Sequence, residues 1–481
     1  MRSPEILSIA ETLRSYQQGE LTPVDVAQAC IEAYGRREPD CQAWECFDAE
    51  HLLQAAGDSA QRLQNSDVAL PLEGIPVAVK DIFNTSDFPT QMGSPLWRGF
   101  TPGNDARAVF NVKRAGGLIA GKTVTAEFAV HALGKTLNPH NGLLTPGTSS
   151  SGSAVAVATG MVPVAMGTQT AGSIVRPASF CGVWGCKPSF GLIPRTGMLK
   201  TTDSLDSVGF FVRYAADLAP VFDALRVHGR DYPLSHAALS DVTRQQSPVD
   251  RPWRVALVRP HVWHAVAPYA ARAFDAWCNQ LAANPRFEVI EQDLPLAMVR
   301  SHQVHELIYN RALAYYFKEE FAKAELISPI MYRLIRSGQA VSNRAYQTAL
   351  DGQITMAREM DHFFGKCDVM LTLSTAGAAP PREQEEAPDS ALMWTLTHLC
   401  VVSAPAFQSP DGLPFGLQLV ARRYNDRLLF RFIDEVVSLG LLPVAQFPRD
   451  RAGEPDLDVV ADNAVLPVAA LMPPVCPLPT Q

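Results

Sequence analysis

Two hydrophobic patterns divide the N-terminal part of the chain. Within residues 4–64, apolar residues recur three and four positions apart, which predicts amphipathic helices. From residue 72 onward, short uninterrupted apolar runs stand between Gly and Pro residues, a pattern typical of strands buried on both faces. The first such run, residues 74–81, ends in Lys80 and Asp81. The change at residue 72 therefore predicts an outer helical layer followed by a buried sheet.

The same patterns recur toward the C-terminus and predict an α/β protein. Residues 174–212 carry Gly and Pro between short apolar runs, which predicts strands and turns. Residues 226–252 are polar and irregular, which predicts a boundary or a surface excursion. Further strands or apolar runs lie at residues 118–120, 253–258, 368–373, 399–402 and 413–420, and further helices are predicted at residues 105–115, 270–283, 301–364 and 427–439.

Residues 145–173 (TPGTSSSGSAVAVATGMVPVAMGTQTAGS) concentrate small residues and hydroxyl groups. Serines at positions 149, 150, 151 and 153 stand immediately before the apolar run 154–158. Burial of that run draws the serines inside, where a hydroxyl without a hydrogen-bond partner costs about 1–3 kcal/mol. Partnered buried hydroxyls can relay a proton to a nucleophile. The alternative is a flexible Ser/Gly linker, although linkers do not usually continue into an apolar segment.

Lys80 follows a buried strand and allows two interpretations. Such a lysine usually extends its ammonium group to the surface. The alternative is a desolvated lysine with a depressed pKa, which can act as a base near neutral pH. Because side chains alternate along a strand, Asp81 is expected on the opposite face and unpaired with Lys80. The residues alone leave both interpretations open.

Residues 116–123 (GGLIAGKT) match the phosphate-loop pattern G-x-x-x-x-G-K-T. That pattern binds phosphate when a strand precedes the loop and a helix follows it. Here a helix is predicted before the loop, and residues 118–120 inside it are predicted to be a strand. We therefore expect no ATP binding at this stretch.

Charge and composition argue against several classes of function. The net charge is −8 and no basic cluster occurs, so we expect no nucleic-acid partner. We find no apolar run long enough to span a membrane and no secretory signal, and we expect a cytoplasmic protein. The nine cysteines are scattered, and Cys181 and Cys186 lack the further ligands of a metal site. We expect free thiols, no metal and no cofactor.

Three motifs, in this order along the chain, resemble the amidase signature family of hydrolases. They are GIPVAVKD with Lys80, TPGTSSSGSAVAVATG with Ser149, and GTQTAGSIVRPASFCGVWGCKP with Ser173. The two serines are 24 residues apart, the separation that this family uses between its catalytic serines. The segment GLPFGLQLVARRYND resembles the family's closing strand and loop. The resemblance covers residues 5–445 and is strongest over residues 72–212.

The resemblance implies a fold. We expect a single large α/β/α layered domain with a mixed central β-sheet covered by helices, plus a helical insertion that caps the active site. The amidase signature domain would span residues 1–447, with its core at residues 70–215 and 366–445 and the cap at residues 265–365. Residues 448–481 are expected to form a poorly ordered tail.

The resemblance also implies roles for individual residues. Ser173 would be the nucleophile, Lys80 the base, and Ser149, held by a cis peptide bond, the relay between them. Ser151 and Thr168 would orient the relay. The oxyanion hole would consist of the backbone N–H groups of Thr170, Ala171, Gly172 and Ser173.

The substrate pocket is less defined by sequence. In relatives that resemble malonamidase, an arginine at the place of Arg176 binds a substrate carboxylate, and a structural arginine that holds the loop is an equal alternative. Met92, Trp97 and an aromatic cluster that includes Tyr309 would instead favour a bulky apolar acyl or aryl group.

By this resemblance the protein is expected to hydrolyse C–N bonds of small linear amides, including aryl amides or carbamates, through an acyl-enzyme. One alternative is the A-type subunit of a glutamine-dependent amidotransferase, which needs partner subunits; another is a non-catalytic scaffold. The expected ligand is a small-molecule amide. Whether the protein forms a homodimer stays open.

Overall fold

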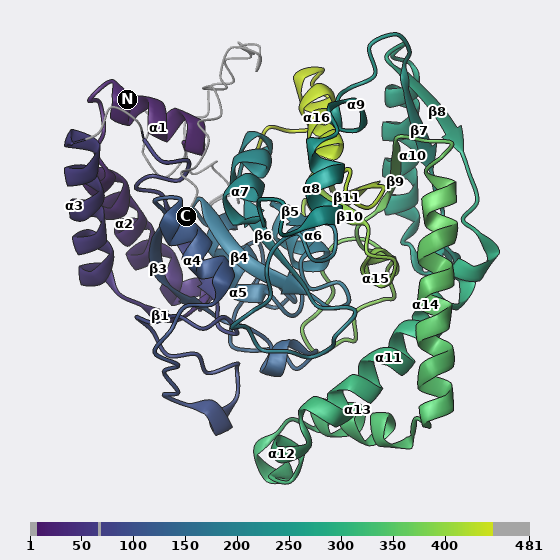
Figure 1. Ribbon diagram of the computed structural model, residues 1–481, viewed down its shortest axis with the longest axis horizontal. Coiled ribbons are helices and arrows are strands. Elements are labelled where there is room, and N and C mark those ends of the chain that lie inside the picture. Colours follow the sequence, from purple (N-terminus) through teal and green to yellow (C-terminus); the bar gives the residue numbers. More distant parts are fainter. Residues whose placement is uncertain (1–6, 66–68, 446–481) are drawn as a thin grey trace. The chain divides into compact units, whose positions relative to one another are not determined.

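A computed structural model describes residues 7–65 and 69–445, and the predicted tail at residues 448–481 lies outside the described residues. An 11-stranded sheet runs through the structure (Figure 1). Its strands are β1 Trp44–Phe47, β2 Pro76–Lys80, β3 Leu118–Thr123, β4 Val164–Gln169, β5 Trp184–Lys187, β6 Ser207–Val212, β7 Trp253–Leu257, β8 Phe287–Glu291, β9 Val369–Leu373, β10 Cys400–Gln408 and β11 Pro414–Ala421.

The sheet is mixed, as predicted. The spatial order of its strands is β1-β3-β2-β4-β6-β5-β10-β11-β9-β7-β8. Strand β2 runs parallel to both β3 and β4, and β7 runs parallel to β8 and β9. The strands between β4 and β9 pair in antiparallel fashion. Strands β2 and β4 therefore end at the same edge of the sheet, which brings Lys80 close to residues 168–170.

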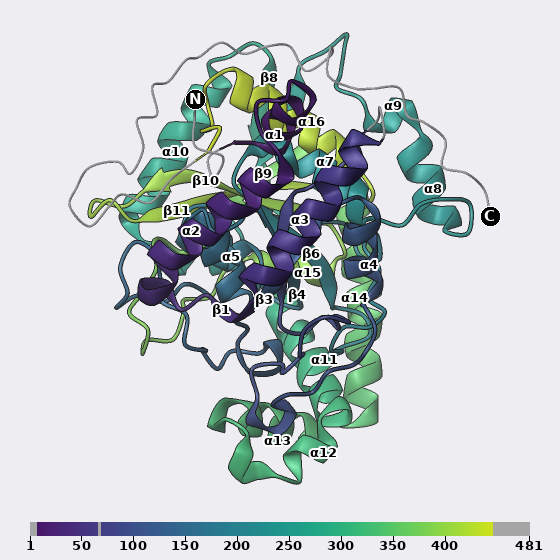
Figure 2. The ribbon, with the colours of Figure 1, turned by 90° about the vertical axis from the view of Figure 1, so that its left-hand side faces the viewer.

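One face of the sheet is covered by helices rich in small residues. They are α2 Pro23–Cys41, α3 Ala49–Gln64, α5 Ser151–Ala158 and α6 Val175–Cys181, and Figure 2 shows α2 and α3 in front of the sheet. Every residue of α5 is buried, because its SGSAVAVA sequence is apolar or small on all sides. Small side chains from these helices pack on Ala78 and Ala165. Helix α5 thus lies directly against the strands that carry the catalytic candidates.

The opposite face is covered by a second set of helices. They are α1 Ile9–Gln17, α4 Arg107–Arg114, α7 Leu218–Leu225, α10 Pro268–Ala282 and α16 Asp426–Ser438. Their apolar residues pack on Val77 and Val79 of β2 and on Leu417 and Leu419 of β11. Because helices cover both faces, the strands carry near-continuous apolar runs. The predicted α/β/α layering is confirmed.

A helical region follows β8 in the chain. It contains α11 Ser301–Tyr316, α12 Lys318–Phe321, α13 Pro329–Ala340 and α14 Asn343–Phe363, and α15 Ala391–Leu396 packs with it. Figure 1 shows α11, α13 and α14 side by side. Their buried side chains, including Tyr309 of α11, form one apolar cluster with Met92 and Phe128. None of the helices in the described residues is long and apolar enough to span a membrane.

Several local predictions need correction. Residues 175–181 form helix α6 rather than strands and turns, because Pro177 lies in the first helical turn, where its missing N–H costs no bond. The polar stretch 226–252 contains α8 Pro233–Ser240 and α9 Val242–Gln245. Strand β8 lies within the range expected for the cap. The division into core, cap and tail stays a prediction.

Candidate active site

Lys80 is the last residue of β2 and is fully buried. Side chains alternate along a strand, so Lys80 shares the face of Ala78, which packs in the same cluster as α5. Its Nζ donates hydrogen bonds to Ser149 Oγ at 2.8 Å and to Thr168 Oγ1 at 2.9 Å. The surface interpretation of Lys80 is therefore wrong, and the desolvated one holds.

The buried surroundings act on the charge of Lys80. Burial lowers the pKa of Lys80 well below its ordinary value, and the negative charge of Asp206 opposes part of that shift. No ion pair to Lys80 occurs among the described residues. A neutral amine at this position can accept a proton through the same 2.8 Å contact with Ser149.

Asp81 pairs with a lysine other than Lys80, as the alternation of side chains along the strand predicts. Its Oδ1 lies 3.0 Å from Nζ of Lys122, and its Oδ2 accepts a hydrogen bond from the Gln91 N–H. Lys122 also donates to Thr90 and to the carbonyl oxygen of Phe83. Lys122 is the lysine of the phosphate-loop pattern. Because its ammonium group is bound to Asp81, Thr90 and Phe83 within the protein, it is not available to a phosphate. Residues 118–123 form β3, as the reversed order of elements predicts.

The serine-rich loop enters α5 with most of its hydroxyls paired. The peptide bond between Thr148 and Ser149 is cis. Ser150 Oγ donates to the Thr168 carbonyl at 3.1 Å, and Ser153 Oγ donates to the Met166 carbonyl at 2.8 Å. The linker alternative is therefore wrong. Ser151 Oγ is buried and has no hydrogen-bond partner within residues 7–65 and 69–445, so no contact supports its expected orienting role.

Ser150 approaches β4 closely because position 167 is Gly. A Cβ at Gly167 would come within 3.0 Å of Ser150 Oγ and within 2.7 Å of the Phe211 ring. Any larger residue would push the serine loop away from the strand. The glycine thus allows the loop to hold Ser149 beside Lys80.

Ser173 lies two residues before α6 and is 6% exposed. The backbone N–H groups of Ala171, Gly172 and Ser173 have no hydrogen-bond partner within the described residues. Unpaired donors in a buried loop are what an oxyanion hole requires. No hydrogen bond joins Ser149 to Ser173 in the described part of the chain, so the contact for the second step of the expected relay is not present in this structure.

The loop that carries these donors is fixed on several sides. The Gln169 side-chain oxygen accepts hydrogen bonds from the N–H groups of Ile174 and Val175. Thr395 of α15 donates to the Ala171 carbonyl at 2.9 Å. A ring nitrogen of His305 lies 2.9 Å from the Thr170 carbonyl oxygen. The contacts with Thr395 and His305 use carbonyl groups of the loop, so they leave the N–H groups of Ala171, Gly172 and Ser173 unused.

Arg176 is engaged by two carboxylates. Its Nε lies 2.8 Å from Asp389 Oδ2, and its Nη1 lies 3.0 Å from Glu386 Oε2. Glu386 also accepts a hydrogen bond from the Thr145 hydroxyl. A Cβ at Gly172 would come within 2.9 Å of Arg176 Nη2, so the guanidinium group lies over the oxyanion loop. These contacts favour the structural alternative for Arg176.

A cavity of about 580 Å³ opens beside this cluster. Thr148 and Arg176 reach it from the catalytic loops, whereas Ser173 is not among its lining residues. Its wall carries both signs of charge, from Arg176, Arg333, Arg382, Glu383, Glu385, Glu386 and Asp389. Arg382 donates to the carbonyl groups of residues 134 and 136, while Arg333 makes no ion pair in the described part of the chain.

The other predicted pocket residues lie apart from these charges. Met92 and Tyr309 are buried in the cluster shared with the helical region. Tyr309 packs on His305, which bonds to the oxyanion loop. The indole N–H of Trp97 donates to Glu320 of α12, so the structure does not bring Trp97 to the catalytic cluster.

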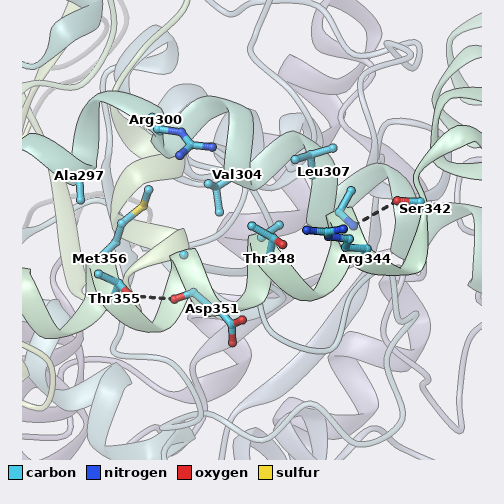
Figure 3. Close-up of a pocket in the computed structure, with 13 residues that line it drawn as sticks. Ala297, Arg300, Val304, Leu307, Ser342, Arg344, Thr348, Asp351, Thr355 and Met356 are labelled. Carbon is cyan, nitrogen blue, oxygen red and sulfur yellow. Dashed lines mark hydrogen bonds between the residues drawn. The ribbon is translucent and has the colours of Figure 1, made fainter.

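A second, larger cavity of about 660 Å³ lies away from the catalytic residues. It is lined by Val304 and Leu307 of α11 and by Ala349 and Met356 of α14 (Figure 3). Lys80, Ser149, Thr168 and Ser173 are not among its lining residues. No group of three or more His, Cys, Asp or Glu side chains in residues 7–65 and 69–445 could hold a metal ion.

Sequence reasoning missed several residues that hold the site. Asp206, which bonds to Thr170, stands in a hydroxyl-rich stretch directly before the apolar run of β6. The acidic segment 382–389 is visible in the sequence, but no local pattern links it to Arg176, about two hundred residues earlier. His305 is one of several helical histidines and gives no distinguishing signal.

Comparisons with known proteins are consistent with this geometry. A protein-family model described as amidase matches residues 25–430. The A subunit of the glutamyl-tRNA(Gln) amidotransferase of Rhodopirellula baltica is 30% identical over 473 residues, covering 88% of this chain and 94% of that protein. The corresponding protein of Chloroflexus aggregans is 28% identical over 467 residues, covering 89% and 95%. The crystal structure of peptide amidase from Stenotrophomonas maltophilia superposes with a TM-score of 0.79 at 24% identity, covering 92% and 99%.

Proposed function

The chain belongs to the amidase family of enzymes that act on carbon–nitrogen bonds, and from this premise we propose that it releases ammonia from the side-chain amide of glutamine, as the A-type subunit of an amidotransferase that works with partner subunits. The contact between Lys80 and Ser149 carries the proposal, because it joins a desolvated amine to a hydroxyl in the order that a proton relay needs. The choice of glutamine follows from the relatives, which are glutamyl-tRNA(Gln) amidotransferase subunits.

The reaction proceeds through an acyl-enzyme. Neutral Lys80 takes the proton of the Ser149 hydroxyl, and Ser149 takes the proton of Ser173. Ser173 Oγ then bonds to the amide carbonyl carbon, and the N–H groups of Ala171 and Gly172 donate to the oxygen that gains negative charge. When the C–N bond breaks, the proton returns through Ser149 to the leaving nitrogen, and ammonia departs. Water then hydrolyses the ester on Ser173 by the same relay.

The mixed charges of the 580 Å³ cavity support an amino-acid substrate. Free glutamine carries one ammonium and one carboxylate group, so it is matched by a wall that carries both carboxylates and guanidinium groups. Arg176 is held by Asp389 and Glu386, which leaves the exposed Arg333 as the candidate partner of the substrate carboxylate. Glu383 and Glu385, also exposed, are the candidate partners of the ammonium group.

A second candidate is a free-standing hydrolase of small linear amides, including aryl amides or carbamates. The apolar cluster of Met92, Phe128 and Tyr309 favours it, because Tyr309 connects through His305 to the oxyanion loop. An uncharged acyl or aryl group would suit these apolar side chains better than a zwitterion would.

Ammonia release from a panel of amides separates the two candidates. Purified protein would be given glutamine, asparagine, an aliphatic amide, an aryl amide and a carbamate, with the Ser173→Ala variant as the blank. The proposal expects glutamine to have the highest kcat/KM of the panel. A higher kcat/KM for an uncharged amide would reject glutamine and favour the free-standing hydrolase.

The Arg333→Gln variant tests recognition separately from chemistry. Its KM for glutamine should rise about tenfold, because one charge-assisted hydrogen bond is lost. Its KM for an uncharged aliphatic amide should not change. An equal change in KM for both substrates would show that Arg333 does not bind the carboxylate of glutamine.

A further inference from the structure

Asp206 is a buried carboxylate held by an unusual number of neutral donors. Its Oδ1 accepts hydrogen bonds from the hydroxyls of Thr170 at 2.8 Å, Thr201 at 2.5 Å and Thr202 at 3.0 Å. Its Oδ2 accepts from the N–H groups of Thr201 at 2.8 Å and Thr202 at 3.0 Å. An ionised carboxylate only accepts hydrogen bonds, and these five donors occupy both of its oxygens.

No basic side chain pairs with this carboxylate in the described residues. Arg195 is a cationic neighbour, but its guanidinium group donates to the backbone carbonyl of Asp206 rather than to its side chain. A buried charge without an ion-pair partner is costly, and the five hydrogen bonds to Asp206 offset part of that cost without neutralising the charge. The site therefore contains one fixed negative charge that its own surroundings do not neutralise.

The sheet register brings this charge close to Lys80. Asp206 immediately precedes β6, in which Ser207 pairs with Gln169 and Val208 pairs with Thr168. Thr168 Oγ1 is in turn 2.9 Å from Lys80 Nζ. The carboxylate thus lies beside the strand end that the lysine contacts, and its charge acts on the Lys80 amine.

The other groups around Lys80 are neutral or are paired elsewhere. Ser149, Thr168 and the whole of α5 carry no ionisable side chain. On β3, Thr123 stands opposite Lys80 in the register, and Lys122 forms an ion pair with Asp81. Asp206 is the charged group that acts on Lys80 within the described residues.

We propose that Asp206 is a positioning residue whose fixed negative charge stabilises the ammonium group that Lys80 becomes when it takes the Ser149 proton. The same carboxylate holds Thr170, and with it the start of the oxyanion loop. The proposal rests on the proposed function in that Lys80 acts as the base. The proton balance is simple: Lys80 gains the proton that Ser149 gives up, Ser149 regains one from Ser173, and Asp206 gains and loses nothing.

The Asp206→Asn variant tests the charge and keeps the shape. Without the negative charge, protonated Lys80 is less stable. The limb of the profile in which kcat/KM rises with pH should therefore move about one pH unit lower. The maximal kcat/KM should fall, because Lys80 becomes a weaker base. The Thr170→Val variant is the control: it removes a hydroxyl from the same carboxylate but keeps the negative charge, so the limb should move to higher pH rather than lower.

A second readout does not depend on turnover. Cyanic acid reacts with neutral amines only, so at fixed total cyanate the rate at which Lys80 is carbamylated, followed by mass spectrometry, is level below the titration of Lys80 and falls through it. The carbamylation midpoint should move with the kinetic limb in Asp206→Asn. If no amide is turned over and the midpoint still moves, the proposed function fails and the inference on Asp206 stands.

A purely structural Asp206 gives a different result. Asp206→Asn would then lower kcat/KM or stability while both midpoints stay at the wild-type pH, and the proposal would be overturned. If Asp206→Asn does not fold, Thr201→Val replaces it, because loss of that hydroxyl concentrates the charge on the carboxylate. Both midpoints should then move to higher pH, and midpoints that stay or move lower would overturn the proposal.

Discussion

Lys80 Nζ lies 2.8 Å from Ser149 Oγ at the end of a fully buried strand. A lysine in such surroundings usually pairs with a carboxylate, yet the adjacent Asp81 pairs with Lys122 on the other face of the strand. Lys80 therefore has no carboxylate partner in the described part of the chain that would hold its proton, whereas Lys122 is held in a buried ion pair with Asp81. Substitutions at the two lysines should therefore have different effects, on catalysis at Lys80 and on stability at Lys122.

Ser173→Ala should reduce kcat by several powers of ten and leave the fold intact, because one hydroxyl is removed from the attacking group. The measurement is ammonia release together with the urea unfolding midpoint. Ser151→Ala is the matched control: Ser151 Oγ has no hydrogen-bond partner among the described residues, so its loss should change kcat less than about tenfold. Near-normal turnover by folded Ser173→Ala would end the assignment of the nucleophile.

Lys80 should set the pH dependence of the reaction. Burial lowers the pKa of Lys80, and only the neutral amine can accept a proton. The value of kcat/KM should therefore rise with pH through the pKa of Lys80, and activity should be lost as the pH falls below that pKa. The limb should lie well below the ordinary range of lysine, in a profile measured with one amide at fixed ionic strength.

Two substitutions at Lys80 separate base catalysis from charge. Lys80→Ala should cost several powers of ten in kcat/KM, and Lys80→Arg should not restore activity, because arginine stays protonated throughout the working range. Single-turnover rates on the same substrate are the measurement. An arginine variant with near-normal turnover would mean that position 80 acts through charge alone, and the relay would have to be abandoned.

The extent to which sequence can anticipate this site differs from residue to residue. The catalytic candidates are found because each stands in a distinctive local motif, and strand alternation alone separates Asp81 from Lys80. Contacts such as Arg176 with Asp389 join positions that are distant in the chain, and nothing local marks them. Helix α6 escapes prediction because Pro177 looks like a turn signal, although the first helical turn tolerates it.

Activity should survive a chelator and should need no nucleotide. None of the proposed proton transfers uses a metal ion, and the lysine of the phosphate-loop pattern is bonded to Thr90 and Asp81 inside the protein. Ammonia release after dialysis against EDTA, with and without ATP, checks both points. Loss of activity that one added metal restores, or tight ATP binding by calorimetry, would contradict this expectation.

Lys122 should contribute to stability through its pairing with Asp81, and the effect should depend on pH. Both side chains are buried, and burial raises the pKa of Asp81 and lowers the pKa of Lys122 while each partner opposes the shift of the other. Lys122→Met leaves the carboxylate uncompensated, which typically costs about 3–5 kcal/mol. Without Lys122, the pKa of Asp81 in the folded state should rise further above its unfolded value of about 4.

The folded variant then holds a proton that the unfolded chain releases, so its stability falls as the pH rises above the unfolded carboxyl value. Urea unfolding should therefore show a smaller difference from the wild type at pH 5 than at pH 8. The double variant Lys122→Met with Asp81→Asn removes the buried charge and should recover much of the loss at pH 8. A Lys122→Met protein equally destabilised at both pH values would show that lost packing, rather than the unpaired carboxylate, causes the effect.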